Sequence, residues 1–208
     1  MKTIRCHQIN DDISTISLDE VDIAPPGAGE VQIRVMACSV NFPDVLMIQG
    51  KYQFAPPLPF APGGEFAGEI VAVGPDVDQF KVGDRAVAGT RYGGFSELVN
   101  AEVQAVKPVP PGISFEKAAA YQTAYLTAYV ALTIRGSLKA GETLLVHGAT
   151  GGVGLAAVDL GKHLGATVIA TGGTDEKLAV VKARGADHVI NYTLPDDSLG
   201  GFREKVKG

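Results

Sequence analysis

One segment determines how this chain can fold: Thr143-Leu144-Leu145-Val146-His147-Gly148-Ala149-Thr150-Gly151-Gly152-Val153-Gly154. Residues 143–147 form a near-continuous apolar run, which is typical of a strand in a parallel sheet that is covered on both faces. The glycines then predict a sharp turn, and a helix is expected from residue 152 to residue 164. A strand, a glycine-rich turn and a helix in this order are the context in which such a motif binds a dinucleotide.

The glycines of this turn have separate physical tasks. One lets the chain reverse sharply, another lets a pyrophosphate approach a backbone without a Cβ, and the last lets the helix pack close to the sheet. Free N–H groups and the partial positive charge at the helix N-terminus then favour a bound phosphate. The spacing is G-x-x-G-x-x-G rather than the stricter G-x-G-x-x-G, so a glycine-rich turn that binds nothing is the alternative. We predict that a diphosphate binds at Gly151, Gly152, Val153 and Gly154.

Strand and helix patterns continue to alternate after this turn. Strands are expected at residues 167–171 and 188–191, with a helix between them at 175–184 that Gly185 ends. A last helix is expected to begin near Asp197. The β-α-β-α-β order predicts the first half of a Rossmann fold, which is a parallel sheet with flanking helices.

The end of the second strand indicates which dinucleotide binds. NAD sites place a carboxylate there for the ribose hydroxyls, but the turn at 171–174, which includes Gly172, has no acidic residue. Lys177 follows closely enough to reach a 2′-phosphate, so we favour NADPH over NADH, with an ordinary surface lysine as the alternative. Tyr192 is expected either to border the adenosine end of the cofactor or to be a surface aromatic residue.

The chain changes character near residue 115. Before it, prolines and glycine turns separate short β-branched runs, and strands expected at 31–35, 69–73 and 85–88 predict a small β-rich domain. After it, residues 115–134 predict a helix that begins at Ser114. We therefore expect an α/β protein with two domains, residues 1–115 and residues 116–208.

Composition and charge argue against several classes of function. The net charge of -5 disfavours nucleic acid, because phosphate contacts require a basic face. No apolar run approaches the ~20 residues that span a bilayer, and no apolar segment of a signal peptide follows Met1. We therefore expect a cytoplasmic protein without a membrane partner, in which Cys6 and Cys38 are free thiols.

Several motifs make the chain similar to one known family. In the second half they are residues 141–154, Lys162-His163-Leu164-Gly165-Ala166 and Gly185-Ala186-Asp187-His188-Val189-Ile190-Asn191-Tyr192. In the first half they are Asn41-Phe42-Pro43-Asp44, Gly50-Lys51-Tyr52, Pro62-Gly63-Gly64-Glu65-Phe66-Ala67-Gly68, Val82-Gly83-Asp84-Arg85 and Gly94-Phe95-Ser96-Glu97. The chain resembles the medium-chain dehydrogenase/reductase superfamily, and within it the zinc-independent, zeta-crystallin-like quinone oxidoreductases. The resemblance implies a GroES-like catalytic domain before the Rossmann domain.

The resemblance also implies an enzyme without zinc. Asn41 and Gly64 stand where the alcohol dehydrogenase branch has a cysteine and a histidine ligand, and Glu65 alone cannot supply the three protein ligands of a catalytic zinc. Alcohol oxidation benefits from a Lewis acid, whereas a quinone or an enone is already electrophilic. Such an acceptor can take a hydride from NADPH when it is held against the nicotinamide.

By the same resemblance, three side chains are expected at the reacting groups. Asn41 and Tyr52 would face the nicotinamide and the substrate, and Thr127 would contact the carboxamide. Tyr52 is the candidate proton donor, although it could be a packing residue while solvent supplies the proton. The alternatives are a turn residue for Asn41 and a hydroxyl bonded to its own helix for Thr127. We expect Asp44 to be a turn or cap residue and His147 to be packed.

These features predict an NADPH-dependent oxidoreductase that transfers a hydride to a quinone. An enoyl-thioester reductase is the near alternative, because residues 47–52 are similar to the tyrosine-bearing segment of those enzymes. A non-catalytic NADPH-binding protein is the alternative from another class. Members of the family that the chain resembles are longer. Without the further strands of a complete Rossmann sheet, strand 143–147 would be an exposed sheet edge. We therefore expect the chain to be a fragment, or a partner to cover that edge, with a homodimer as the expected assembly.

Overall fold

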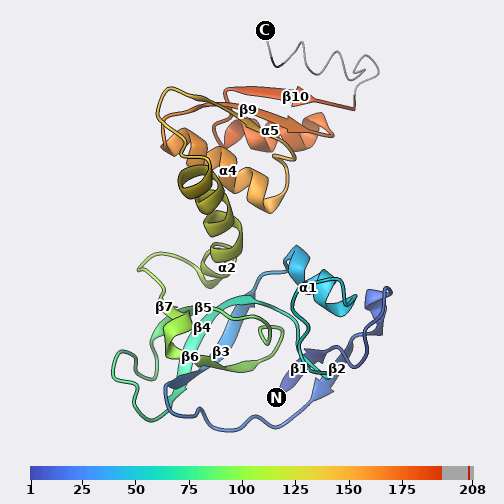
Figure 1. The fold of residues 1–208 in the computed structure, drawn as a ribbon. Helices are drawn as coiled ribbons and strands as arrows, with labels where there is room; N and C mark the ends of the chain where they lie inside the picture. The colour runs from blue at the N-terminus through green and yellow to red at the C-terminus, as the bar shows by residue number, and fades with distance from the viewer. Residues whose placement is uncertain (194–205, 207–208) are drawn as a thin grey trace. The chain divides into compact units, whose positions relative to one another are not determined.

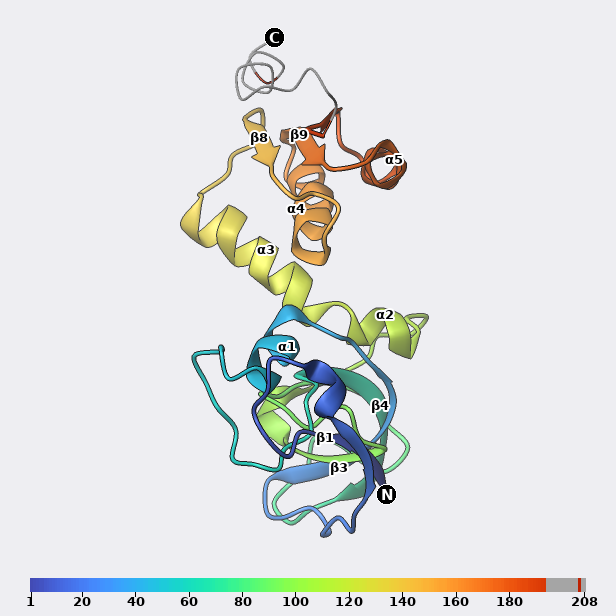
Figure 2. The same cartoon turned by 90° about the vertical axis from the view of Figure 1, so that its right-hand side faces the viewer.

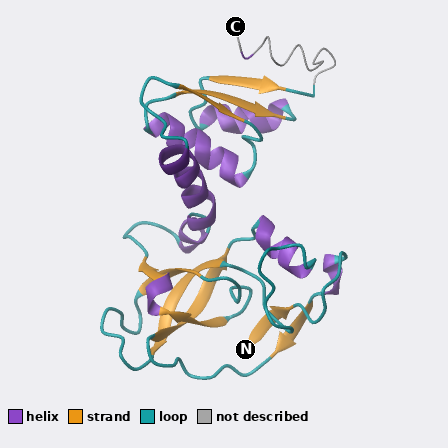
Figure 3. Ribbon diagram, in the orientation of Figure 1, coloured by secondary structure: helices purple, strands orange, loops and turns teal. Residues whose placement is uncertain are grey.

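The computed structural model describes residues 1–193 and residue 206, and it forms two compact units (Figure 1). The units are Met1–Gln122 and Thr123–Gly208, whereas the sequence predicted a domain boundary after residue 115. Strands dominate the first unit, and helices accompany a small sheet in the second (Figure 3). Among the described residues, no helix is long and apolar enough to cross a membrane.

The first unit is built around a five-stranded antiparallel sheet in the order β6-β3-β4-β5-β7. Its strands are β3 (Glu30–Cys38), β4 (Glu65–Val73), β5 (Arg85–Gly89), β6 (Leu98–Glu102) and β7 (Val106–Pro108). A separate antiparallel pair joins β1 (Lys2–Arg5) to β2 (Ser17–Glu20). The strands predicted at 31–35, 69–73 and 85–88 are confirmed, and each extends further than its pattern indicated.

Alternation along these strands fills the core of the first unit. Val31 and Ile33 of β3 are fully buried, as are Phe66 and Ile70 of β4. Antiparallel pairing of β3 with β4 brings Ile33 opposite Ile70, so apolar side chains from neighbouring strands pack on the same face. The short elements outside the sheet are η1 (Ile13–Thr15), α1 (Phe42–Ile48), η2 (Val103–Ala105) and α2 (Phe115–Ala119).

The helix predicted at 115–134 is continuous in the sequence pattern but interrupted in the structure. It begins as expected, because the hydroxyl of Ser114 accepts the N–H of Lys117 at 3.3 Å and caps α2. The chain then turns at residues 120–121 and becomes helical again. This second part comprises η3 (Gln122–Leu126), α3 (Thr127–Tyr129) and η4 (Val130–Arg135). The carboxylate of Glu65, from β4, accepts the N–H of Gln122 and thereby caps the restarted helix.

The second unit has a three-stranded parallel sheet in the order β10-β9-β8. Its elements are β8 (Thr143–Val146), α4 (Gly152–His163), β9 (Thr167–Gly172), α5 (Asp175–Ala183) and β10 (His188–Asn191). Both α4 and α5 lie against one face of the sheet, and α3 packs on α4 (Figures 1 and 2). The predicted β-α-β-α-β order is confirmed, and the helix expected from Asp197 lies outside the described residues.

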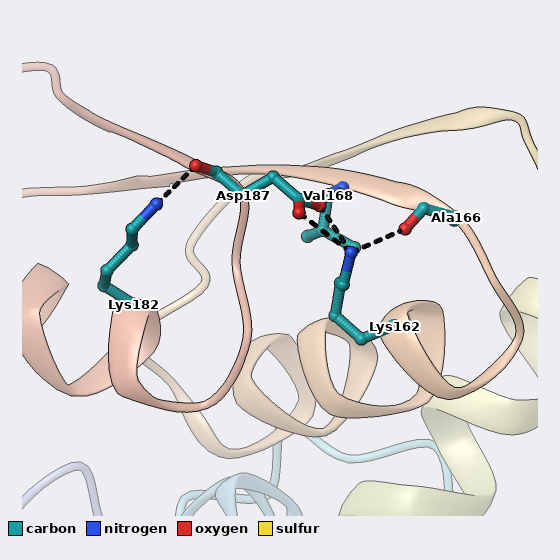
Figure 4. A network of polar contacts seen from close by, with 5 residues as sticks. All are labelled: Lys162, Ala166, Val168, Lys182 and Asp187. Atoms are coloured by element: carbon teal, nitrogen blue, oxygen red, sulfur yellow. Dashed lines mark hydrogen bonds and ion pairs between the residues drawn. The ribbon is translucent and has the colours of Figure 1, made fainter.

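A polar network ties the end of α4 to the strands at the end of the sheet away from the glycine turn (Figure 4). The ammonium of Lys162 donates to both carboxylate oxygens of Asp187, at 2.9 and 2.8 Å, and to the carbonyl of Ala166 at 3.2 Å. Asp187 also accepts the N–H of Val168 at 2.6 Å, and Lys182 donates to its carbonyl. The hydrogen bonds from Lys162 and from the Val168 N–H lower the pKa of Asp187.

Candidate functional site

The glycine turn lies directly between β8 and α4, at the strand-to-helix junction that the sequence predicted. Gly148 has a φ of 61°, a left-handed conformation that favours glycine. A Cβ on Gly154 would lie 2.3 Å from the carbonyl oxygen of Gly148, so that position accepts no side chain. A Cβ on Gly151 or Gly152 would meet nothing closer than 3.6 or 4.0 Å. The last glycine therefore sets the close packing of the turn, and the two before it leave open backbone.

The first turn of α4 presents backbone donors rather than side chains. The N–H of Leu155 is the first to bond within the helix, to the carbonyl of Gly151 at 2.8 Å. The amides of Gly152, Val153 and Gly154 precede it, and no side chain caps the helix at Gly151. They border a hollow of about 520 Å³ that is also lined by β8. Unpaired amides at a helix N-terminus beside an open space can bind a phosphate.

The end of β9 lies beside this turn. The N–H of Ala149 donates to the carbonyl of Thr171 at 3.0 Å, and a Cβ on Gly172 would lie 2.8 Å from Thr150. Gly172 thus allows the end of the second strand to approach the glycine turn. Thr174 caps α5 by accepting the N–H of Lys177 at 3.4 Å, which places the exposed lysine in the first turn of that helix.

Tyr192 and Asp175 complete the surroundings of this strand end. A Cβ on Gly173 would lie 3.5 Å from the phenol oxygen of Tyr192, so this exposed tyrosine lies beside the turn that follows β9. The carboxylate of Asp175 accepts the amide of Asn191 at 2.7 Å. Lys177 forms no ion pair with any described residue.

Thr127 and His147 belong to the same unit. Thr127 is exposed at the start of α3, one turn after Ala124, whose Cβ is the atom nearest to a Cβ built on Gly152. The expectation that His147 is packed is wrong, since its side chain is exposed and its ring Nδ1 lies 3.3 Å from the hydroxyl of Thr171. The apolar strand ends at Val146, one residue earlier than predicted, which leaves His147 at the turn.

In the first unit, Asn41 stands at the N-terminus of α1. Its side-chain Nδ2 donates to the hydroxyl of Ser39 at 2.8 Å and to the carboxylate of Glu65 at 3.4 Å. Asp44 accepts the N–H of Asn41 at 2.7 Å and the N–H of Gly63 at 3.1 Å, which confirms Asp44 as a cap residue. Burial raises the pKa of Asp44 despite these hydrogen bonds.

Tyr52 and the two cysteines lie in or beside the cores of this unit. Tyr52 is half-buried and packs against the cluster of Cys6, Met47, Ile48 and Phe60. Both thiols are free. Cys38 donates to the carbonyl of Glu65 at 3.2 Å, and burial raises the pKa of Cys38 to about 12. A thiol with so high a pKa is a weak nucleophile at neutral pH.

Glu65 is the functional candidate whose partners the sequence did not reveal. Its side chain is 1% exposed, and its carboxylate accepts three donors: the hydroxyl of Ser39 at 3.0 Å, the amide of Asn41 and the N–H of Gln122. A glutamate within the apolar pattern of residues 65–70 was the available signal. Within the described part of the chain, no three His, Cys, Asp or Glu side chains are grouped so that they could hold a metal ion.

Comparison with known proteins identifies the family. Residues 27–111 match the family described as Alcohol dehydrogenase GroES-like domain, and residues 152–207 match Zinc-binding dehydrogenase. Quinone oxidoreductase-like protein 2 of Mus musculus is 37% identical over 193 residues, which cover 92% of this chain and 54% of that protein. The chain belongs to the medium-chain dehydrogenase/reductase family.

Other medium-chain dehydrogenase/reductase relatives cover the chain to a similar extent. The crystal structure of Escherichia coli quinone oxidoreductase complexed with NADPH is 34% identical, with a TM-score of 0.88, over 100% of this chain and 63% of that one. A mycocerosic acid synthase-like polyketide synthase of Mycobacterium tuberculosis is 37% identical over 180 residues, which cover 86% of this chain and 8% of that protein. The chain thus spans about half of the mouse relative and under two thirds of the bacterial structure.

As a medium-chain dehydrogenase/reductase, the chain combines a GroES-like, β-rich first unit with a partial Rossmann fold. The candidate residues form one group in each unit. In the second unit, Gly172 at the end of β9 lies beside the glycine turn, Tyr192 lies beside Gly173, and Lys177 is in the first turn of α5, which follows β9. The first unit joins Asn41 to Glu65 by a hydrogen bond, while Tyr52 lies in a neighbouring apolar cluster.

Proposed function

We propose that this chain is the cofactor- and acceptor-binding part of an NADPH-dependent quinone oxidoreductase that acts without zinc. The observation that carries the proposal is the row of backbone amides at Gly152, Val153 and Gly154, which opens a helix beside a hollow and has no side-chain cap. This geometry suits a diphosphate, because it supplies donors and a positive dipole end without a bulky side chain. The Escherichia coli relative was solved with NADPH, which agrees with this assignment.

The choice of NADPH rests on the end of β9. The turn there carries glycines in place of a ribose-binding carboxylate, and Asp175 is already bonded to Asn191. Lys177 then supplies the positive charge for a 2′-phosphate, and Tyr192 borders the adenosine end. Thr127 lies on the helix that passes Gly152 and binds the carboxamide in this account.

When bound, NADPH supplies the hydride. The chain's own residues position the acceptor and deliver a proton. Asn41 offers an amide to the acceptor oxygen, and the phenol of Tyr52 donates a proton to the oxygen that becomes negative after the hydride has been transferred. Gly64 and Asn41 carry no metal-binding side chain, so this chemistry relies on positioning of an electrophilic acceptor rather than on a Lewis acid.

The test is NADPH oxidation with a series of acceptors, followed at 340 nm. We expect turnover with a quinone, undiminished after treatment with a chelator, and no stoichiometric zinc in the purified protein. A chelator-sensitive rate would contradict zinc-independent chemistry. NADPH binding without turnover of any acceptor would favour the non-catalytic alternative.

A second candidate function is the reduction of an enoyl thioester. The similarity to the mycocerosic acid synthase-like polyketide synthase supports it. Reduction of a short enoyl-CoA faster than a quinone, with loss of that activity in Y52F, would establish this function instead. In either case the partner is a small molecule, and we propose a cytoplasmic homodimer whose state can be measured by light scattering after size exclusion.

A further inference from the structure

Arg91 is held on a row of aromatic rings in the first unit. Its Cζ lies 4.8 Å from the centroid of the Phe54 ring, a distance at which a guanidinium is attracted to the face of the ring. Phe54 stacks on Tyr92 with 6.1 Å between the ring centroids, and Tyr92 meets Phe60 edge-on at 6.3 Å. Phe60 is buried and Arg91 is exposed, so the row of rings leads from the core to the surface. The rings restrict where the guanidinium lies, while the residue stays accessible to a ligand.

The backbone around Arg91 is fixed to the segment that leads into β4. The N–H of Thr90 donates to the carbonyl of Gly64 at 2.8 Å, and a Cβ on Gly64 would lie 3.7 Å from the carbonyl oxygen of Arg91. The next residue is Glu65, whose carboxylate accepts the amide of Asn41. The loop that carries Arg91 therefore lies beside the segment that contacts Asn41.

The row of rings also includes neighbours of Tyr52, the proposed proton donor. Tyr52 and Phe54 are two residues apart in the sequence, and both pack against the buried cluster that contains Phe60. Arg91 lies over Phe54 from the opposite segment of the unit. Arg91 and Tyr52 thus belong to one group of packed side chains, although they come from different loops.

Arg91 differs from the other cations around this group. The ammonium of Lys51 lies 2.5 Å from a carboxylate oxygen of Asp11, and the guanidinium of Arg5 donates to the carbonyl of Pro59 at 3.1 Å. Within the described part of the chain, no Asp or Glu forms an ion pair with Arg91. Its guanidinium is a planar fork of N–H donors, which matches the two oxygens of a carboxylate or a phosphate.

We propose that Arg91 determines the substrate class by binding a carboxylate or phosphate group of the acceptor, while the electrophilic end of the acceptor lies at Tyr52. The inference rests on the proposed function, in which the phenol of Tyr52 donates a proton to the reduced acceptor. The shared chemistry is an oxyanion on a tail at some distance from the reacting group. A carboxylate tail on a quinone and the phosphates of a coenzyme A thioester are its two sources, and matched acceptors distinguish them.

The first measurement compares acceptors that differ in charge. Naphthoquinones with carboxyalkyl tails of increasing length are assayed beside their methyl esters at saturating NADPH. Crotonyl-CoA and crotonyl-pantetheine form the second pair, because only the first carries phosphates. We expect a lower KM for the anionic member, and a preference that weakens as ionic strength rises. The pair that shows the preference identifies the source of the oxyanion.

The variant R91M keeps an unbranched side chain over Phe54 but removes the charge. For R91M we expect the KM of the preferred anionic acceptor to rise about ten- to a hundredfold, as for the loss of a charged hydrogen bond. The KM of its neutral partner and the Kd of NADPH should not change, which a merely structural role of Arg91 would not predict. R91K keeps a charge and should restore part of the preference. The matched control is R34M, which removes an exposed arginine from β3 and should behave as the wild type.

The role of Arg91 can be tested without turnover and without a variant. Calorimetric Kd values of each acceptor in the presence of NADP⁺ give the same comparison of the anionic with the neutral member. Equal affinities within both pairs in the wild type, or equal losses for both members in R91M, would overturn the proposal.

The two proposals can fail separately. A wild-type protein that reduces no acceptor would contradict the proposed function, while the Kd values still decide whether Arg91 selects an anion. A wild-type protein that binds no member of either pair would contradict both proposals. Turnover of quinone acids and esters with equal KM, together with equal KM values for the two thioesters, would leave the proposed function standing and remove Arg91 from it.

Discussion

Gly152 and Gly154 lie in the same turn but have different surroundings. A Cβ on Gly154 would lie 2.3 Å from the carbonyl oxygen of Gly148, whereas a Cβ on Gly152 would meet nothing closer than 4.0 Å. We expect G154A to lower the free energy of unfolding by about 1–3 kcal/mol, because backbone atoms must move apart. We expect G152A to change it by less than about 1 kcal/mol, because alanine favours the helix.

The two variants should also differ in the origin of any loss in cofactor binding. If the diphosphate lies against the backbone of the first turn, the methyl group of G152A occupies the space of the diphosphate. We therefore expect G152A to lower the affinity for NADPH by about tenfold or more, which is at least ~1.4 kcal/mol. Urea unfolding and calorimetric titration measure both quantities. A folded G152A that binds NADPH as tightly as the wild type would argue against a diphosphate at this turn.

Lys177 is the position where the choice of cofactor can be measured. A charged hydrogen bond to phosphate contributes about 1.5–3 kcal/mol, so K177A should lower the affinity for NADPH by about ten- to a hundredfold. It should leave the affinity for NADH unchanged, because NADH has no 2′-phosphate. K117A removes another exposed lysine from a helix terminus in the first unit and serves as the control. An equal loss for both cofactors in K177A would assign the lysine another role.

Individual residues also show which features of the site could be predicted from the sequence. The position of the glycine turn from Gly148 to Gly154 was predictable, because the spacing of its glycines and the flanking strand and helix are local signals. Glu65 was not, since its donors Ser39, Asn41 and Gln122 come from separate segments that only the folded sheet brings together. A glutamate within an apolar strand indicates burial, but it does not name its partners.

Among the helices and strands, the break at residues 120–121 of the predicted helix was also missed because it depends on a contact between distant segments. Local periodicity predicted one helix over 115–134, and alanine at positions 118–120 favours it. The carboxylate of Glu65 on the N–H of Gln122 comes from β4, so no local pattern could reveal the break. Six strands, β3, β4, β5, β8, β9 and β10, were predictable, because burial alternates along them or is nearly continuous. The other four, β1, β2, β6 and β7, were not predicted.

The junction of α4 with β9 and β10 depends on Asp187. Its pKa is lowered by the hydrogen bonds from Lys162 and the Val168 N–H (Figure 4). A carboxylate whose folded-state pKa lies below its unfolded value stabilises the fold above the unfolded pKa, and this stabilisation is lost as pH falls through the folded-state pKa. D187N should therefore be less stable than the wild type at neutral pH.

The difference in stability between D187N and the wild type should shrink as the pH falls below about 4, the ordinary pKa range of an aspartate. Thermal unfolding across a pH series measures it. D78N changes an exposed aspartate in a loop of the first unit and is the control. A difference between D187N and the wild type that stays constant down to the lowest pH would show that the charge of Asp187 does not stabilise the junction.

For the chain as a whole, both the sequence pattern and the family assignment divide it into a β-rich part and a partial Rossmann part. The parallel order β10-β9-β8 follows from the alternation of strands and helices, because right-handed crossovers leave few other arrangements. Within the part of the chain that the structure describes, β8 is the last strand of this sheet and pairs only with β9.

The central claim is that the amides of Gly152, Val153 and Gly154 bind the diphosphate of NADPH. It is tested most directly by ¹H–¹⁵N spectra of the assigned protein during a titration with NADPH. We expect these amide protons to show the largest changes in chemical shift, with Lys177 and Tyr192 also affected. Saturable binding of NADPH that leaves the three amides unshifted would contradict the account.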